Sequence, residues 1–274
     1  MRGECVPPNE RELQILQTAA NAISLDDRPQ SNFLSIGAMQ VLGYGLYSRN
    51  SKTSWRICTP EKILDQLGSA LAVYGLTEAR PSEYAIQLAV QLPNPSDLVI
   101  QQVGNVTFNA SKQHSDLLRQ QDIRPMARSA LARFGARAVA FSDVAVREMN
   151  SRSSMGTGAA QVAAATGHPA ALPWITREFN ELLGGVPTKA AIPIDTRDRL
   201  LELAWAIYFA GDAGRSSAVA IHRLMAKKVE SRAPPFGIVE IWPKSFCRVL
   251  ELIEGRSARD TYAYCLDDSV PFEQ

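Results

Sequence analysis

The sequence is poor in the residues that usually build metal and catalytic centres. It holds three histidines and four cysteines in 274 residues. His114, His168 and His222 are not paired at metal-ligand spacing, and none stands beside a nucleophile motif. The cysteines include no CxxC pair, so neither a zinc site nor a disulfide framework is indicated. We therefore predict no metal, no cofactor and no enzymatic activity.

Phosphate-binding and cofactor-binding loops are also missing. AGDAGRSS, residues 210–217, has glycines and hydroxyls but lacks the lysine and the spacing of a P-loop. GYGLYS, residues 43–48, does not match the dinucleotide fingerprint, and no GxSxG elbow occurs. A helical enzyme with an unrecognised site is the weakest of the functional hypotheses.

Long apolar runs are absent as well. The longest fall far short of the roughly 18 to 20 residues that a membrane span requires, so we expect no contact with a membrane. No secretory leader is recognisable, and together with the scattered cysteines this favours a reducing, cytoplasmic setting.

Charge is balanced overall, but arginine dominates the cations. The net charge is +1, so any affinity for nucleic acid must come from locally clustered charge. Of the 29 basic residues 22 are arginine, whose planar guanidinium binds phosphate bidentately and stacks on bases. Residues 119–152 hold seven arginines against three acidic residues. This segment is the best candidate for contact with nucleic acid.

The hydrophobic pattern predicts a mainly α-helical fold. We expect a helix over 59–75, with Thr59 as N-cap and Gly75 as its end, and another over 80–92. The segment 97–108 fits either a small β-hairpin or a polar loop. Further helices are expected in the C-terminal half, over 172–183, 195–211 and 215–229.

The segment 125–150 is predicted to form one continuous helix with two distinct sides. On a wheel of 100° per residue, its large apolar residues gather on one side, and Arg133, Arg137 and Arg147 lie opposite. Arg124 and Arg128 form another pair, one turn apart, near its start. The arginine side is either a phosphate-binding surface or a solvated face with intrachain salt bridges to acidic residues of the same helix, Asp143 or Glu148.

The stretch after this helix is rich in serine, glycine and alanine. Residues 150–169 are weakly periodic, which is typical of a mobile loop or of a surface that another chain approaches closely. An alanine-rich surface at 156–171 supports an alternative function, a helical adaptor or effector that binds protein and no nucleic acid. The aromatic side chains of Trp174, Trp205 and Tyr208 either belong to the core or stack on the bases of a nucleic acid.

Several segments, in order along the chain, resemble coat proteins of flexuous filamentous plant RNA viruses. TPEKILDQLGSALAVYGL, residues 59–76, resembles the first core helix of that family. ARSALARFGARAVAFSDVAVREMNSR, residues 127–152, resembles its central helix, with FSDVA similar to the potyvirus form and ARFGA to the flexivirus form. DTRDRLLELAWAIYFAGDAGRSSAVAIHRLMAKKV, residues 195–229, is similar to its late helix pair.

The resemblance implies an architecture and a function. It implies an N-terminal arm and lead-in over 1–58, a helical RNA-binding core over 59–232 and a C-terminal arm over 233–274. The arms would dock on neighbouring copies, so that the protein polymerises helically around single-stranded genomic RNA. Its partners would be RNA and further copies of itself, and its location the virion and the host cytoplasm.

The resemblance also implies an RNA site made by a serine, an arginine and an aspartate in one groove. Ser96, in NPSDL, matches the serine, and Arg128 matches the arginine, with Arg133 as a competing match. The aspartate is where the sequence departs from the family, because the equivalent position falls near Ile207 and Asp198 or Asp212 would have to substitute. The expected RNA-binding residues are Ser96, Arg124, Arg128, Arg133, Arg137, Arg147 and Asp198.

Overall fold

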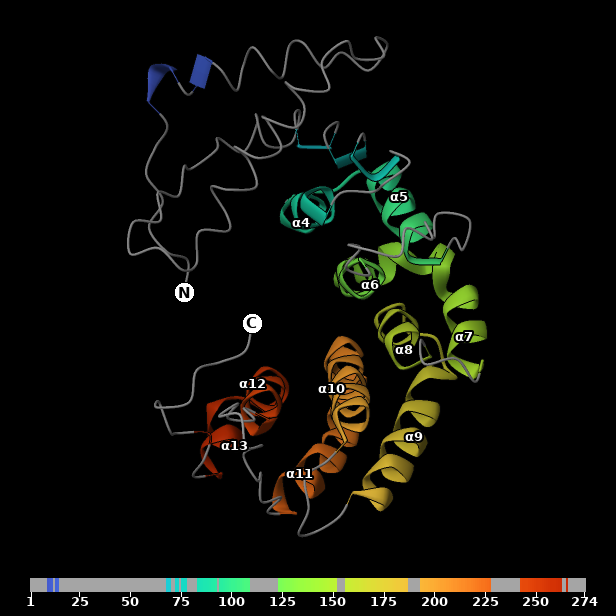
Figure 1. The fold of residues 1–274 in the computed structure, drawn as a ribbon, viewed down its shortest axis with the longest axis vertical. Coiled ribbons are helices and arrows are strands. Elements are labelled where there is room, and N and C mark those ends of the chain that lie inside the picture. Colours follow the sequence, from blue (N-terminus) through green and yellow to red (C-terminus); the bar gives the residue numbers. More distant parts are fainter. Residues whose placement is uncertain are drawn as a thin grey trace. The chain divides into compact units, whose positions relative to one another are not determined.

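The chain folds into helices, as the computed structural model in Figure 1 shows. The residues that the structure describes contain no strand, so the prediction of a mainly α-helical fold is confirmed. None of the described helices combines the length and the apolar character needed to cross a bilayer. The described residues are 9–11, 13–14, 68–69, 72–73, 75–77, 83–92, 94–108, 123–151, 156–186, 193–227, 242–262 and 265.

The chain divides into two compact units. The first is Met1–Phe134 and the second is Gly135–Gln274. This division lies within the segment 59–232 that we expected to form the core. The boundaries expected near residues 58 and 232 lie outside the described residues, and so does most of the expected N-terminal arm.

Three helices are fully delimited in the first unit. They are α4 (Glu83–Gln91), α5 (Asp97–Phe108) and α6 (Arg124–Arg133). α6 packs against both α4 and α5, and α4 also contacts α5. The shared core is built from small and medium apolar side chains, which let the helices approach closely. Its buried members include Ile86, Leu88, Ala89, Val99, Ile100, Val103, Ala127, Ala130 and Leu131.

The β-hairpin expected near 97–108 is wrong, because this segment is helix α5. Ser96 precedes the helix, and its Oγ accepts a hydrogen bond from the backbone N–H of Val99 at 3.3 Å. Asp97 in the first turn is also favourable for the helix dipole. The valines and isoleucine that suggested a strand recur at helical spacing and are buried, so packing overrides their β preference.

The first predicted helix is only partly described. Residues 68–69, 72–73 and 75–77 are helical, so the helix runs past Gly75, which we expected to end it. The expected helix over 80–92 is confirmed as α4.

The single helix predicted over 125–150 is wrong, because the chain breaks at Gly135. α6 ends at Arg133, and Gly135 adopts a φ of +58°, a left-handed conformation that glycine tolerates far better than other residues. A 3₁₀ helix, η2 (Gly135–Phe141), follows and leads directly into α7 (Ser142–Asn150). The break also coincides with the division between the two units.

The second unit is built around α8 (Gly156–Ala165), which packs against α7 on one side and α10 (Ile194–Phe209) on another. Nine of its ten residues are buried. The expectation of a mobile loop or exposed alanine-rich surface over 156–165 is therefore wrong. Small side chains serve here to bring neighbouring helices close together.

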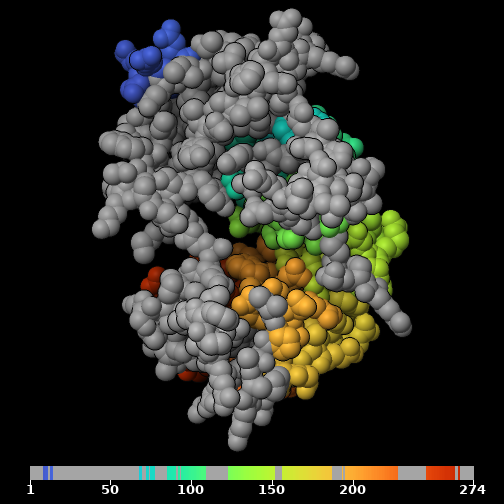
Figure 2. Space-filling view, viewed as in Figure 1, coloured from blue at the N-terminus to red at the C-terminus, as the bar shows by residue number. Residues whose placement is uncertain are grey.

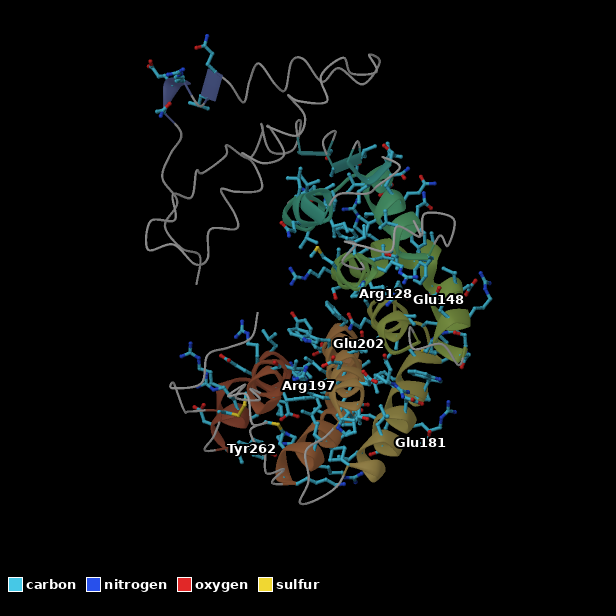
Figure 3. The ribbon with its side chains drawn as sticks, viewed as in Figure 1. Arg128, Glu148, Glu181, Arg197, Glu202 and Tyr262 are labelled. Atoms are coloured by element: carbon cyan, nitrogen blue, oxygen red, sulfur yellow. A yellow bond between two sulfur atoms is a disulfide. The ribbon has the colours of Figure 1, made fainter. Side chains whose placement is uncertain are left out.

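Polar contacts connect α8 to α10. The Thr157 hydroxyl donates a hydrogen bond to the Glu202 carboxylate, and the Gln161 amide donates one to the Glu202 backbone oxygen at 3.4 Å. Figure 3 shows Glu202 on α10, within the group of helices that surrounds α8. Both Thr157 and Gln161 are buried, so these hydrogen bonds satisfy polar groups inside the core.

The remaining helices of the predicted C-terminal half are present. α9 (Ala171–Gly185) and α10 confirm two of them, and α10 ends just before Gly211, whose φ is +60°. A 3₁₀ helix, η3 (Gly211–Ala218), then leads into α11 (Val219–Ala226). Lys227 ends α11 and donates hydrogen bonds from Nζ to the Leu183 and Val186 carbonyl oxygens, at 2.6 and 3.2 Å. These contacts fix the end of α11 to the end of α9.

Two further helices lie within the segment expected to be a C-terminal arm. α12 (Trp242–Glu254) packs against α10, η3 and α11, and α13 (Arg256–Asp260) packs on α12. This part of the chain therefore belongs to the second compact unit.

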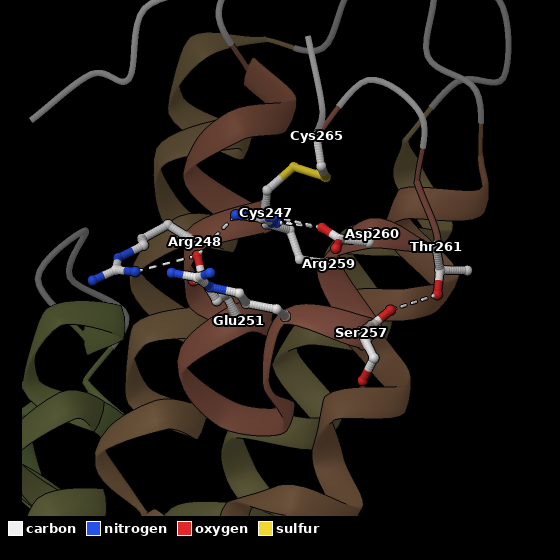
Figure 4. A network of polar contacts seen from close by, with 9 residues as sticks. Cys247, Arg248, Glu251, Ser257, Arg259, Asp260, Thr261 and Cys265 are labelled. Carbon is white, nitrogen blue, oxygen red and sulfur yellow. Dashed lines mark hydrogen bonds and ion pairs between the residues drawn. A yellow bond between two sulfur atoms is a disulfide. The ribbon is translucent and has the colours of Figure 1, made fainter. Parts of the chain in front are cut away.

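A disulfide links α12 to the residues after α13, contrary to the sequence-based expectation that the cysteines form no disulfide framework. Cys247 and Cys265 are bonded, with their Cα atoms 5.7 Å apart and a sequence separation of 18 (Figure 4). The reversal of the chain after α12 brings the two cysteines together, which their spacing alone does not indicate. Beside the disulfide, Glu251 forms ion pairs with Arg248, Arg256 and Arg259 at 3.2 to 3.5 Å.

Candidate nucleic-acid interface

The exposed side of η2 and α7 forms a continuous stripe. A 3₁₀ helix has three residues per turn and an α-helix 3.6, so positions 137, 140, 143, 147 and 150 follow one another along the same side. All five are exposed, whereas the opposite side of the two helices faces α8. We call residues Arg137, Ala140, Asp143, Arg147 and Asn150 the η2–α7 stripe. The buried residues opposite it are Ala138, Ser142, Ala145 and Met149.

The arginines keep their exposure although the helix is broken. Arg137 lies in the 3₁₀ helix and Arg147 in the last turn of α7, and both side chains are on the surface of the second unit. In Figure 2 the yellow-green atoms of α7 and the yellow atoms of α9 form one continuous surface. The stripe is therefore accessible to a ligand that runs along the unit.

Arg147 has no acidic partner among the described residues. The side chain of Asp143, one turn away, is 86% exposed, and its Oδ1 lies 3.9 Å from His168 Nε2. Glu148 has one buried carboxylate oxygen, Oε2, which has no hydrogen-bond partner among the described residues. Salt bridges to Asp143 or Glu148, the alternative explanation of the arginine side, are thus not seen for Arg147.

Several other arginines of the second unit are paired with carboxylates. On α9 Arg177 lies 3.9 Å from Glu181, and in η3 Arg215 lies 3.3 Å from Asp212. Arg199 on α10 is bonded to Glu178. Since a paired guanidinium is partly neutralised, Arg147 offers a stronger attraction to phosphate than these do.

The residues expected in the first unit differ in their environments. Ser96 is exposed and caps α5, as described above. Arg128 is only 3% exposed, so its guanidinium is packed inside and does not lie on an open surface. Arg124 is half-buried at the start of α6, and Arg133 at its end is exposed with no ion pair to a described residue.

The aspartate that the resemblance implies for the RNA site lies in the second unit. Asp198, on α10, is exposed and forms an ion pair with the neighbouring Arg197, with 2.9 Å between Oδ1 and Nη2. Figure 3 shows Arg197 on the same helix. The expected serine, arginine and aspartate therefore come from different units, and within the second unit the structure groups Arg137 with Arg147 on one stripe.

A second polar cluster links α11 to the C-terminal helices. His222 Nδ1 lies 2.8 Å from the Tyr262 hydroxyl, and His222 Nε2 lies 2.9 Å from Glu254 Oε2. Burial, and then the negative charge of Glu254, raises the pKa of Tyr262 above its ordinary value. The hydroxyl therefore stays protonated at neutral pH and can donate a hydrogen bond to the His222 carbonyl, 3.3 Å away. These hydrogen bonds connect α11 to the end of α12 and to the residues after α13.

Metal binding finds no support in the described part of the chain. It contains no group of three histidine, cysteine or carboxylate side chains arranged to hold an ion.

Comparisons with known protein families, with curated proteins and with solved structures find no match for this chain. A mainly helical fold serves many functions, so function has to be argued from the site.

Proposed function

We propose that this protein binds single-stranded RNA and coats it as the repeating subunit of a helical nucleocapsid, in the manner of a flexuous viral coat protein. The observation that carries the proposal is the η2–α7 stripe, where Arg137 and Arg147 are exposed along one side of two consecutive helices. A strand laid along the stripe would meet a guanidinium near each end.

The chemistry of the stripe favours a phosphate backbone. A coat subunit has to bind any sequence of its genome, and contacts to phosphate position a strand without reading its bases. Arginine is the side chain best suited to such contacts, and Arg147 has no described carboxylate competing for it. The near-neutral net charge of +1 also permits many copies to stack with little mutual repulsion.

The resemblance of the segments at 59–76, 127–152 and 195–229 to flexuous coat proteins supports the same function. The adaptor alternative has lost its main support, because α8 buries most of the alanine-rich segment that was expected to form its surface. Arg128 plays no part in the proposal, since it is packed inside.

RNA binding by the full chain tests the proposal. We expect affinity that is tolerant of sequence, increases with strand length and falls steeply with salt. Each phosphate contact on a single strand contributes about 0.7 to the slope of log K against log salt. Arg137→Ala with Arg147→Ala should therefore reduce that slope by about 1.4.

A matched control is Arg177→Ala, because Arg177 is also an exposed helical arginine but is paired with Glu181. It should leave the slope close to that of the wild type. Electron microscopy of the protein mixed with RNA should show filaments, which the double variant forms less readily. RNA binding that is unchanged in the double variant, together with a strictly monomeric wild type, would contradict the proposal.

A further inference from the structure

A cavity of about 290 Å³ lies in the second unit at the end of the η2–α7 stripe. Its walls come from the end of α7, the start of α8 and the facing sides of α9 and α10. A volume near the lower end of the range for small-molecule sites suits one compact group better than an extended chain. The side chains that matter below are Asn150, Thr157, Trp174, Glu178 and Arg199.

The cavity joins an aromatic ring to polar groups without net charge. Trp174 and Glu178 are four residues apart on α9, so both lie on the side of the helix that lines the cavity. Arg199 donates to Glu178 Oε1, and this ion pair neutralises both charges. A neutral cavity discriminates against an isolated phosphate or ammonium group, because neither finds an uncompensated opposite charge there.

Hydrogen-bond acceptors remain next to the ring. The Arg199 contact engages one carboxylate oxygen of Glu178, whose side chain is 18% exposed, and Oε2 forms no hydrogen bond with a described residue. Asn150, on the rim, donates from Nδ2 to the Val146 carbonyl at 2.9 Å, and its Oδ1 is directed to no described donor. A flat, neutral group with N–H donors on its edge matches this combination, and a nucleobase is such a group.

The cavity is also close to Arg147, the side chain proposed to bind the phosphate of the RNA strand. Arg147 precedes the rim residue Asn150 by three positions on α7, which is about 4.5 Å along the helix axis. A nucleotide whose phosphate contacts Arg147 therefore has its base within reach of the opening.

We propose that the cavity lined by Trp174, Glu178 and Asn150 takes one unstacked base of the bound RNA strand. The base stacks on the Trp174 indole, and its N–H groups donate to Glu178 Oε2 and Asn150 Oδ1. This inference rests on the proposed RNA-binding function, and it adds a base-dependent contact to the phosphate contacts of the stripe.

Tryptophan fluorescence tests the inference with the full chain. The two probes are a cytidine oligonucleotide and an abasic ribose-phosphate strand of the same length, which keeps the phosphates and lacks the bases. We expect the oligonucleotide to quench tryptophan emission in the wild type, and the quenching to be lost in Trp174→Phe. Because phenylalanine still stacks, the affinity of this variant should remain within a few-fold of the wild type.

Removal of the ring separates base binding from phosphate binding. Trp174→Ala should weaken binding of the oligonucleotide by about tenfold, the effect of losing one stacking contact, and leave binding of the abasic strand unchanged. Asn150→Trp, at an exposed position on the rim, would fill the opening without disturbing the core and should have the same selective effect.

The outcomes distinguish this inference from the proposed function. If the wild type binds the abasic strand and the oligonucleotide equally, without quenching, the base site is wrong and phosphate binding stands. The same conclusion follows if both Trp174→Ala and Asn150→Trp bind the oligonucleotide like the wild type. If the wild type binds neither strand at low salt, the proposed function itself fails.

Discussion

The disulfide between Cys247 and Cys265 should make a large and measurable contribution to the stability of the second unit. The bond links positions 18 residues apart and encloses the end of α12, all of α13 and the turn between them. Reduction leaves the native contacts in place but frees this loop in the unfolded chain. The predicted effect is therefore on the entropy of the unfolded state.

The magnitude follows from the length of the loop. Closing a loop of this size lowers the free energy of the folded state relative to the unfolded one by about 3 kcal/mol. For a unit of this size, each kcal/mol corresponds to about 2 to 4 °C in Tm, so reduction should lower Tm by roughly 6 to 12 °C. Ion pairs of Glu251 with exposed arginines are expected to add little to this figure.

Thermal unfolding followed by circular dichroism, with and without dithiothreitol, measures the effect. Cys247→Ala should lower Tm by at least as much as reduction, since the side chain is fully buried, and its Tm should be insensitive to the reductant. A wild-type Tm that does not respond to dithiothreitol, in protein shown by thiol titration to be reduced, would refute the reasoning.

Three further changes have definite expected outcomes. A Cβ at Gly214 would overlap the Ile207 carbonyl oxygen. Gly214→Ala should therefore lower the free energy of unfolding, measured in urea, by about 1 to 3 kcal/mol. A variant as stable as the wild type would contradict the close contact between η3 and α10. Ala163→Leu, at a fully buried position of α8, should cost a similar amount, whereas Ala140→Leu on the exposed stripe should stay within about 0.5 kcal/mol of the wild type. Because the folded-state pKa of Tyr262 is raised, the stability that its protonated hydroxyl contributes is present below its ordinary value of 10.0 and is lost as pH rises through the folded-state pKa. Tyr262→Phe should lose less stability than the wild type between about pH 9 and about pH 11, and equal losses would show that this hydroxyl is not responsible.

The sequence predicts those helices whose signals are local. α4, α9 and α10 were expected, because amphipathic spacing, prolines and closing glycines mark their course. α5 was missed because its valines favour a strand in isolation, and only their burial against α6 shows why they are helical. α8 was read as a loop because alanine and glycine give no contrast between a buried and an exposed side.

Tertiary structure decides the features that the sequence leaves open. A single glycine is tolerated inside many helices, so the break at Gly135 cannot be predicted from its identity. The exposure of Arg137 and Arg147 was expected even so, because the 3₁₀ segment and α7 keep both on the outer side. The burial of Arg128 was not expected, since an arginine near the start of an amphipathic helix carries no local signal for it. The spacing of Trp174 and Glu178 was a local signal for the cavity, but its other walls come from α7, α8 and α10.

The small side chains of α8 affect how its position along the neighbouring helices is fixed. A helix covered mostly by methyl groups has shallow ridges, so neighbouring helices could slide along it with little change in contact area. The hydrogen bonds of Thr157 and Gln161 with Glu202 depend on direction and distance. They therefore fix one axial position of α8 relative to α10. Thr157 also lines the cavity, so a slip of α8 by one turn would reshape the proposed base site while leaving the hydrophobic interior largely intact.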